Sequence, residues 1–191
     1  MGELMNLQLK IAEGDESAFE EIYLRYHRKL QLFAQGFVKS TEVAEELVAD
    51  VFVKLWCRRE EAAQIQNLTV YLYTSVKNLA LNALSYEARR FVTQSLDMVE
   101  TDQENTGCSP HDLLVTSEMM QRMQLAIDQL PERCRLIFKL IREDGLKYKE
   151  VAEILNISVN TIDAQMAIAV KRLCSSLGVT RDGKKEAYLS F

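Results

Sequence analysis

Residues 145–173 read GLKYKEVAEILNISVNTIDAQMAIAVKRL, a stretch that predicts two helices joined by a tight turn. Apolar residues three and four positions apart give the first segment one apolar face. Asn156-Ile157-Ser158 interrupts this pattern, and Ser158 is placed as an N-cap whose hydroxyl accepts an unpaired N–H of the next helix. Apolar residues then resume the helical period from Val159 to Leu173. This arrangement is typical of a helix-turn-helix that places its second helix in a DNA major groove, although an αα-hairpin inside a helical domain has the same pattern.

The composition favours an all-helical protein in a reducing compartment. The chain has 191 residues but only two prolines and seven glycines, and helix-forming residues are plentiful. No apolar run reaches the roughly 18 residues of a membrane span, and residues 1–9 lack the features of a secretory signal. The four cysteines form no CxxC pair and there are only two histidines. We therefore expect a cytoplasmic protein with reduced thiols, no metal site and no cofactor.

The charge is unevenly distributed along the chain. The formal net charge is −5, and residues 91–118 contain six acidic residues and no Lys or Arg. The rest of the chain is therefore close to neutral. Because non-specific DNA affinity comes mostly from neutralising phosphates, we expect the isolated protein to bind DNA weakly.

Two helices are predicted at the start of the chain. The first follows a cap at Asp15 or Ser17 and runs to Phe37, with aromatic and aliphatic residues spaced by three and four. The second follows a cap at Thr41 and ends at Trp56. The face opposite its apolar stripe is acidic, which indicates either a solvated surface or a docking face for a basic partner.

A third helix is predicted from about Thr69 to Tyr86, after a polar loop at residues 57–66. Its apolar positions can pack inward, while tyrosines, amides and basic residues surround them. Such a mixture suits single-stranded nucleic acid, since rings stack on bases and cations follow phosphates. The alternative for any single tyrosine is a place in the core.

The second half of the chain begins after a polar, acidic segment. Residues 92–109 have too little apolar content to form a core, so we interpret them as a flexible linker. Helices resume near Pro110, and Pro131 suits the first turn of the next helix. That helix is predicted to end near Gly145, directly before the helix-turn-helix, and residues 180–191 read as a loose tail.

In their order and spacing, these segments resemble the extracytoplasmic-function (ECF) sigma factors, a small two-domain class of the bacterial sigma-70 family. The likeness covers about residues 10–90 and 112–175. The stretches that resemble sigma region 2 are Phe19–Tyr26, Ala44–Trp56 and Tyr71–Asn82, and those that resemble region 4 are Leu130–Phe138 and Gly145–Leu173.

The resemblance implies an all-α protein of two small helical domains joined by a flexible acidic linker. The N-terminal domain would have three to four helices and the C-terminal domain would contain the helix-turn-helix. The implied boundaries are 1–91 for the region 2-like domain, 92–109 for the linker, 110–178 for the region 4-like domain and 179–191 for the tail.

The resemblance also implies that the protein binds core RNA polymerase and directs it to promoters. Region 2 would meet the β′ clamp helices and region 4 the β flap. The residues that match the family's core-binding surface are Glu45, Glu46, Asp50 and Lys54. Ala49 stands where many relatives carry a glutamine, so one polar contact is missing from the family's pattern.

Two sets of residues match the family's DNA-binding regions. Candidates for the melted −10 element, where a flipped base needs a ring or pocket to receive it, are Tyr71, Tyr73, Lys77, Asn78, Asn82, Arg89 and Arg90. Candidates for the −35 element are Ser158, Asn160, Thr161, Ala164, Gln165, Lys171 and Arg172. Gln and Asn can pair bidentately with adenine, whereas Lys171 and Arg172 suit phosphates. Relatives often carry Lys or Arg near Asn160 and near Ile168, and a cap at the position of Lys147, which further indicates weak intrinsic DNA affinity.

The implied partners are core RNA polymerase, promoter DNA and an anti-sigma factor, with no direct insertion into a membrane. An ordinary DNA-binding regulator with the same helix-turn-helix is the alternative, but it would need a sensor or dimer surface in its N-terminal half. An enzyme is disfavoured, because the sequence has no Gly-rich phosphate loop, no metal-spaced His/Cys cluster and no nucleophile signature.

Overall fold

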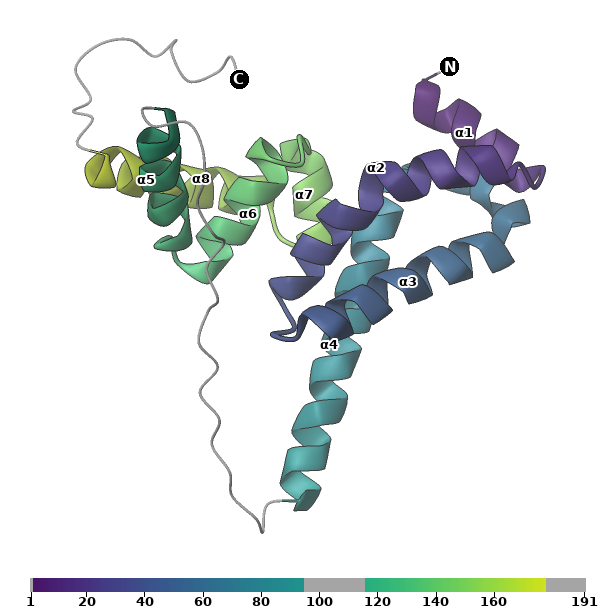
Figure 1. The fold of residues 1–191 in the computed structure, drawn as a ribbon, viewed down its shortest axis with the longest axis horizontal. Coiled ribbons are helices and arrows are strands. Elements are labelled where there is room, and N and C mark those ends of the chain that lie inside the picture. Colours follow the sequence, from purple (N-terminus) through teal and green to yellow (C-terminus); the bar gives the residue numbers. More distant parts are fainter. Residues whose placement is uncertain (1, 95–115, 178–191) are drawn as a thin grey trace. The chain divides into compact units, whose positions relative to one another are not determined.

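The computed structural model describes residues 2–94 and 116–177, and every regular element in these ranges is a helix (Figure 1). The all-α prediction is thereby confirmed. The helices fall into two compact units: α1–α4 with α7, and α5 and α6 with α8. None of the described helices is both long and apolar enough to cross a membrane.

The first unit begins with helices α1 (Glu3–Ala12), α2 (Glu16–Gln35) and α3 (Thr41–Cys57), and α1 was not expected from the sequence. Asp15 caps α2, since its carboxylate accepts from the N–H groups of Ser17 and Ala18 at 2.9 and 3.1 Å. The expected cap of α3 at Thr41 is wrong. Ser40 has extended backbone angles and its hydroxyl accepts the Val43 N–H at 3.2 Å, whereas Thr41 is already helical.

A short 3₁₀ helix, η1 (Arg59–Gln64), occupies part of the segment that was expected to be a loop. Its contact with α1 explains why both elements form. Gln8 of α1 is 5% exposed, and its side-chain Nε2 donates to the carbonyl oxygens of Ala62 at 3.1 Å and Ile65 at 2.8 Å. A buried amide paired in this way holds the chain around η1, because leaving those groups unpaired would be costly.

Helix α4 (Leu68–Gln94) is longer than predicted and includes the first three residues of the expected linker. The rest of that linker, residues 95–109, lies outside the described residues, as do residues 110–115 and the tail from 178 onward. Helices α2, α3 and α4 bury their apolar faces against one another. Within this core the Tyr26 hydroxyl is hydrogen-bonded to Thr69 at 2.6 Å, and burial raises the pKa of Tyr26.

Helix α7 (Tyr148–Leu155) packs on α4 within the first unit. The boundaries 110–178 of the region 4-like domain stay a prediction, although α7, which lies inside that range, belongs to the first unit. Asn156 ends α7 in a left-handed conformation, with φ of 53°. Asn is one of the few residues other than glycine that adopt this conformation readily.

The second unit contains α5 (Thr116–Asp128), α6 (Glu132–Arg142) and α8 (Val159–Ser176). Its core is a cluster from all three helices, with Met123 and Phe138 packed against it. The buried members are Ala126, Ile127, Leu130, Cys134, Ala169 and Leu173. The predicted cap of α8 is confirmed, since the Ser158 hydroxyl accepts the Thr161 N–H at 3.0 Å. Gly145 has a φ of +76°, three residues after α6 ends at Arg142 rather than directly at its cap.

Candidate nucleic-acid and protein interfaces

Helix α3 exposes the polar face that was predicted to bind core polymerase. Its five buried apolar residues lie on the other side, which leaves the four predicted contact residues in solvent. The exposed set is Glu45, Glu46, Asp50 and Lys54. Glu46 and Asp50 are four residues apart, so they share one side of the helix and present two negative charges to the same partner.

An apolar groove of about 470 Å³ lies between α2 and α3 beside this acidic face. Ala49 lines it, together with Val53, which is 60% exposed. The groove contains a stack of rings in which Phe19 lies 4.9 Å from Trp56, measured between ring centroids. The helical spacing of Phe19 does not predict this surface, because periodicity alone does not distinguish a covered aromatic from one at the edge of a helix pair.

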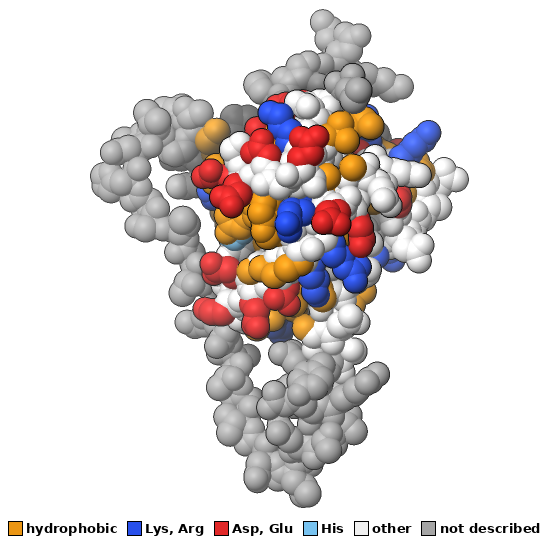
Figure 2. All heavy atoms as spheres, turned by 90° about the vertical axis from the view of Figure 1, so that its right-hand side faces the viewer, with side chains coloured by type: hydrophobic (Ala, Val, Ile, Leu, Met, Phe, Trp, Pro, Cys, Tyr) orange, Lys and Arg blue, Asp and Glu red, His pale blue; other side chains and the backbone are white. Residues whose placement is uncertain are grey.

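Figure 2 shows one face of the molecule, on which exposed hydrophobic side chains form small patches bordered by acidic and basic ones. Exposed apolar groups of this kind on α2 and α3 include Leu24 and Val53, which are 71% and 60% exposed. A partner of the first unit would therefore meet both apolar and charged groups.

The candidate −10 residues differ in accessibility along α4. Asn78 and Asn82 are exposed, and Tyr71 is half-buried. Tyr73 is fully buried, with its ring 5.0 Å from that of Phe33, so in this fold it belongs to the core and is not available to DNA. The expectation for Tyr73 is corrected accordingly.

Tyr71 borders a hollow of about 230 Å³ next to η1. Arg58, Glu61 and Gln64 line the same hollow, so a cation, a carboxylate and an amide surround the ring. The ring and the amide suit an unstacked base, whereas Glu61 offsets the attraction of Arg58 for a phosphate. Arg89 and Arg90 belong to α4, but the structure does not describe their side chains.

Lys77, a further −10 candidate, is half-buried and engaged by α7. Its ammonium Nζ donates to the Ile154 carbonyl oxygen at 2.6 Å. That carbonyl belongs to the last turn of α7, where backbone acceptors lack helical partners and a cation is favoured. A second link joins the same two helices, since the Asn67 side chain donates to Glu150 at 3.0 Å. The bond to Ile154 uses one of the three ammonium donors of Lys77 and restrains the direction in which this side chain can reach a phosphate.

The candidate −35 residues line one side of α8. Asn160, Ala164 and Lys171 are exposed at helical spacing and share a face. Thr161 is half-buried, and its hydroxyl is hydrogen-bonded to that of the capping Ser158 at 2.8 Å. Ser158 therefore shapes the start of the helix, whatever contact it makes with DNA.

Gln165 lies on the flank of α8 and is half-buried. Its Oε1 accepts from the thiol of Cys134 on α6, with 2.8 Å between Sγ and Oε1. The sequence analysis considered Cys134 only as a reduced thiol and did not connect it with Gln165. No local signal could have linked two residues that are 31 positions apart.

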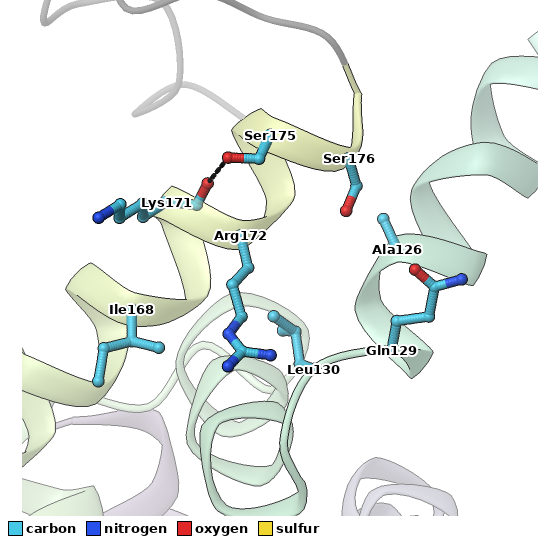
Figure 3. Close-up of a pocket in the computed structure, with 8 residues that line it drawn as sticks. All are labelled: Ala126, Gln129, Leu130, Ile168, Lys171, Arg172, Ser175 and Ser176. Atoms are coloured by element: carbon cyan, nitrogen blue, oxygen red, sulfur yellow. Dashed lines mark hydrogen bonds between the residues drawn. The ribbon is translucent and has the colours of Figure 1, made fainter.

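Arg172, the last −35 candidate, is exposed near the end of α8 and lines a hollow of about 570 Å³ between this helix and α5, together with Lys171. Figure 3 shows that the two cations diverge: Lys171 extends away from α5, whereas the Arg172 guanidinium lies toward Leu130. The Ser175 hydroxyl donates to the Lys171 carbonyl oxygen at 2.9 Å. The two charged groups therefore point in different directions from the end of α8.

Metal-ligating side chains do not gather in the part of the chain that the structure describes, where no group of three His, Cys, Asp or Glu could hold an ion. The site consists of helix faces and shallow hollows, which suits macromolecular partners.

Comparison with known families decides the relationship. Sigma-70 region 2 matches residues 22–90, and sigma-70 region 4 matches residues 120–173. The chain belongs to the sigma-70 family. Its relatives include the ECF RNA polymerase sigma-E factor of Escherichia coli K12, which is 26% identical over 163 residues, 82% of this chain and 85% of that protein. The sigma-E factor of Haemophilus influenzae is 23% identical over 163 residues, 82% of this chain and 86% of the relative.

Two solved structures have a similar fold. The sigma factor RpoE of Bartonella quintana, crystallised with the anti-sigma factor NepR, gives a TM-score of 0.60 at 23% identity, covering 85% of this chain and 98% of that one. CnrH in complex with the cytosolic domain of CnrY gives a TM-score of 0.55 at 16% identity, covering 91% and 96%. At these identities the likeness concerns the fold.

Proposed function

We propose that this protein is an ECF sigma factor that binds core RNA polymerase and directs promoter-specific transcription initiation by recognising −10 and −35 elements. The observation that carries the proposal is the presence of both sigma regions, in order, in one chain. A regulator that only binds an operator would need the helix-turn-helix but not region 2. The polymerase catalyses RNA synthesis. This protein acts in the cytoplasm, where it binds the polymerase and places it at promoters.

The exposed face of α3 is the proposed site for core polymerase. Glu46 and Asp50 supply negative charge beside the apolar groove lined by Ala49 and Val53. An interface of this kind gains specificity from the charges and affinity from desolvation of the apolar groups. The β′ clamp helices are the proposed partner, as the resemblance implies.

The protein is proposed to bind promoter DNA through two weak sites. Exposed Asn78 and Asn82 with half-buried Tyr71 would act on the −10 element, and Asn160, Ala164 and Gln165 on the −35 element. The DNA affinity of each site alone is low, because its surroundings are close to neutral in charge. Polymerase joins them, and linked sites reinforce each other through effective concentration.

An anti-sigma factor is the proposed regulator of this chain. The solved RpoE structure contains the anti-sigma factor NepR, and the solved CnrH structure contains the cytosolic domain of CnrY. The same surfaces that bind polymerase and DNA are the ones such a partner would have to cover.

The direct test is transcription from a cognate promoter by core polymerase with and without this protein. A promoter found by sequencing DNA crosslinked to the protein in cells should contain paired −35 and −10 motifs. We expect a specific transcript only when the protein is present. Equal transcript from core polymerase alone would refute the proposal.

The placement of the core-binding face is tested by the charge reversals Glu46→Arg and Asp50→Arg made together. We expect this double variant to lose core binding while remaining folded, because repulsion replaces attraction at the basic partner. The matched control is Glu13→Arg with Glu20→Arg, which makes the same charge change at exposed positions outside α3. If both pairs weaken core binding equally, the effect is one of net charge and the assigned face is wrong.

A further inference from the structure

Cys134 is a core residue whose thiol donates a hydrogen bond. It is 3% exposed and packs in the cluster that contains Ala169 and Leu173 of α8. Gln165 is one turn before Ala169, so its side chain leaves α8 next to this cluster. The Cys134 Sγ lies 2.8 Å from the Gln165 Oε1. A thiol is a weak donor, but within a buried cluster this bond has little competition from water.

We propose that Cys134 positions Gln165 so that only the amide NH₂ of this glutamine faces the DNA, which makes Gln165 a reader of hydrogen-bond acceptors on base edges. The inference rests on the proposed function, since it gives the specificity of the same −35 contact. Cys134 itself touches no DNA and acts through Gln165.

The consequence follows from the geometry of a glutamine amide. Bidentate pairing with adenine needs both ends of the amide, because Oε1 accepts from the adenine N6 while Nε2 donates to N7. Oε1 has a second lone pair, but its place against the nearly buried Cys134 turns it from the exposed face of α8, so Nε2 is the end left for solvent and DNA. An NH₂ group donates only.

The bases differ in what they offer to such a donor. Guanine presents N7 and O6 in the major groove, adenine N7 and thymine O4, whereas cytosine presents only its N4 donor. Gln165 held by Cys134 therefore accepts guanine, adenine or thymine and rejects cytosine. A freely rotating glutamine would instead favour adenine.

The neighbours of Gln165 on α8 support this role. Asn160 and Ala164 are exposed and share one line along the helix, while Gln165 lies on its flank and is half-buried. A long side chain at the edge of the contact face needs a fixed rotamer to read one base, since otherwise its conformational entropy opposes binding. The bond to Cys134 supplies that restraint.

The first experiment measures base preference at every position of the −35 element by transcription with core polymerase. The full-length protein is compared with Cys134→Ala, Cys134→Ser and Gln165→Ala, and Cys174→Ser is the matched thiol control on α8. Gln165→Ala identifies the base pair that Gln165 reads. There we expect the unaltered protein to disfavour cytosine about three- to tenfold, the worth of roughly one hydrogen bond.

We expect Cys134→Ala to shift that one preference toward adenine and to leave the other positions unchanged. Cys134→Ser should restore the original preference, because its hydroxyl donates as the thiol does, and Cys174→Ser should change nothing. A merely structural loss would lower transcription from all promoters equally. An unchanged profile in Cys134→Ala, or a preference for cytosine in the unaltered protein, would overturn the proposal.

The second experiment does not depend on transcription. The side-chain amide resonances of Gln165 are recorded by nitrogen-15 NMR in the free full-length protein and assigned with Gln165→Ala. We expect Cys134→Ala to move them and Cys134→Ser to keep them close to their original positions. Resonances that are the same in Cys134→Ala would show that the bond is absent and would refute the inference.

The two experiments separate the possible failures. If the unaltered protein supports no transcription but its Gln165 resonances respond to Cys134, the proposed function fails while the positioning bond stands. If transcription is promoter-specific but the Cys134→Ala profile is unchanged, the specificity inference fails alone. Thermal unfolding of each variant is measured first, and the assays are run well below the lowest midpoint.

Discussion

Tyr71 and Tyr73 are two residues apart on α4, yet the structure gives them opposite roles. Tyr73 is fully buried with its ring 5.0 Å from that of Phe33, whereas Tyr71 is half-buried beside a hollow. Replacing each with leucine keeps an apolar side chain and removes the ring. The pair therefore tests whether burial, rather than residue type, decides which tyrosine supports the fold.

We expect Tyr73→Leu to lower the free energy of unfolding by about 2–3 kcal/mol. The loss combines an aromatic pair, worth about 0.5–1.5 kcal/mol, with the space that leucine leaves unfilled. For a small domain this corresponds to a fall of roughly 10–20 °C in the unfolding midpoint. For Tyr71→Leu we expect a change of less than about 1 kcal/mol, because this half-buried ring has less contact area to lose than that of Tyr73.

The assay uses the single tryptophan of the chain. Trp56 lies on α3 with its ring 4.9 Å from Phe19, so its fluorescence reports unfolding of the first unit. Urea titrations give the free energy, and promoter melting by the polymerase complex is followed in parallel. Below the unfolding midpoint, Tyr73→Leu should melt the promoter normally.

Tyr71→Leu should be stable but melt the promoter roughly tenfold less, since stacking of a base on an aromatic ring is worth about 1–3 kcal/mol. The reasoning is refuted if Tyr71→Leu lowers the unfolding midpoint as much as Tyr73→Leu does. It is also refuted if stable, folded Tyr73→Leu loses promoter melting, because a buried ring would then be taking part in the DNA contact.

Three other predictions concern caps and a buried amide. Ser158→Ala should destabilise the second unit by about 1 kcal/mol while Ser158→Asp keeps the cap, as seen by thermal circular dichroism; equal midpoints would contradict the observed bond to the Thr161 N–H. Gln8→Glu should cost about 1–3 kcal/mol in urea unfolding at pH 7, because a carboxylate would face two carbonyl oxygens, and the loss should shrink as the introduced carboxylate is protonated at lower pH. The hydrogen bond from the Ser17 hydroxyl, followed by that from the Ala18 N–H, lowers the pKa of Asp15. Its stabilisation is complete above the ordinary pKa and is lost as the pH falls through the lowered one, so Asp15→Asn should show a smaller acid-induced decline in melting temperature than the unaltered protein.

Helical periodicity anticipated the main helices of the chain, because apolar spacing of three and four is a local signal. Positions where the chain could begin a helix in more than one way were less certain, as Ser40 and Thr41 show. Helix α1 and η1 were not anticipated, since their pairing depends on Gln8, which must reach carbonyl groups more than fifty residues away. The exposure of side chains along α4 could not be predicted from the sequence either. Tyr71 and Tyr73 have similar sequence neighbours, but only the side of α4 that carries Tyr73 packs against Phe33 of α2.

By itself, the sequence determined the class of fold. Its resemblance to sigma factors identified the two sigma regions and the residues that match their contact sites. Composition, helical period and the Asn156-Ile157-Ser158 turn are properties of neighbouring residues, so they can be read without coordinates. Only the tertiary structure decided which of those residues are available. It placed Tyr73 in the core, attached Lys77 to Ile154 and joined Gln165 to Cys134. These assignments depend on contacts between helices, whose geometry is set by packing of whole apolar faces rather than by local sequence.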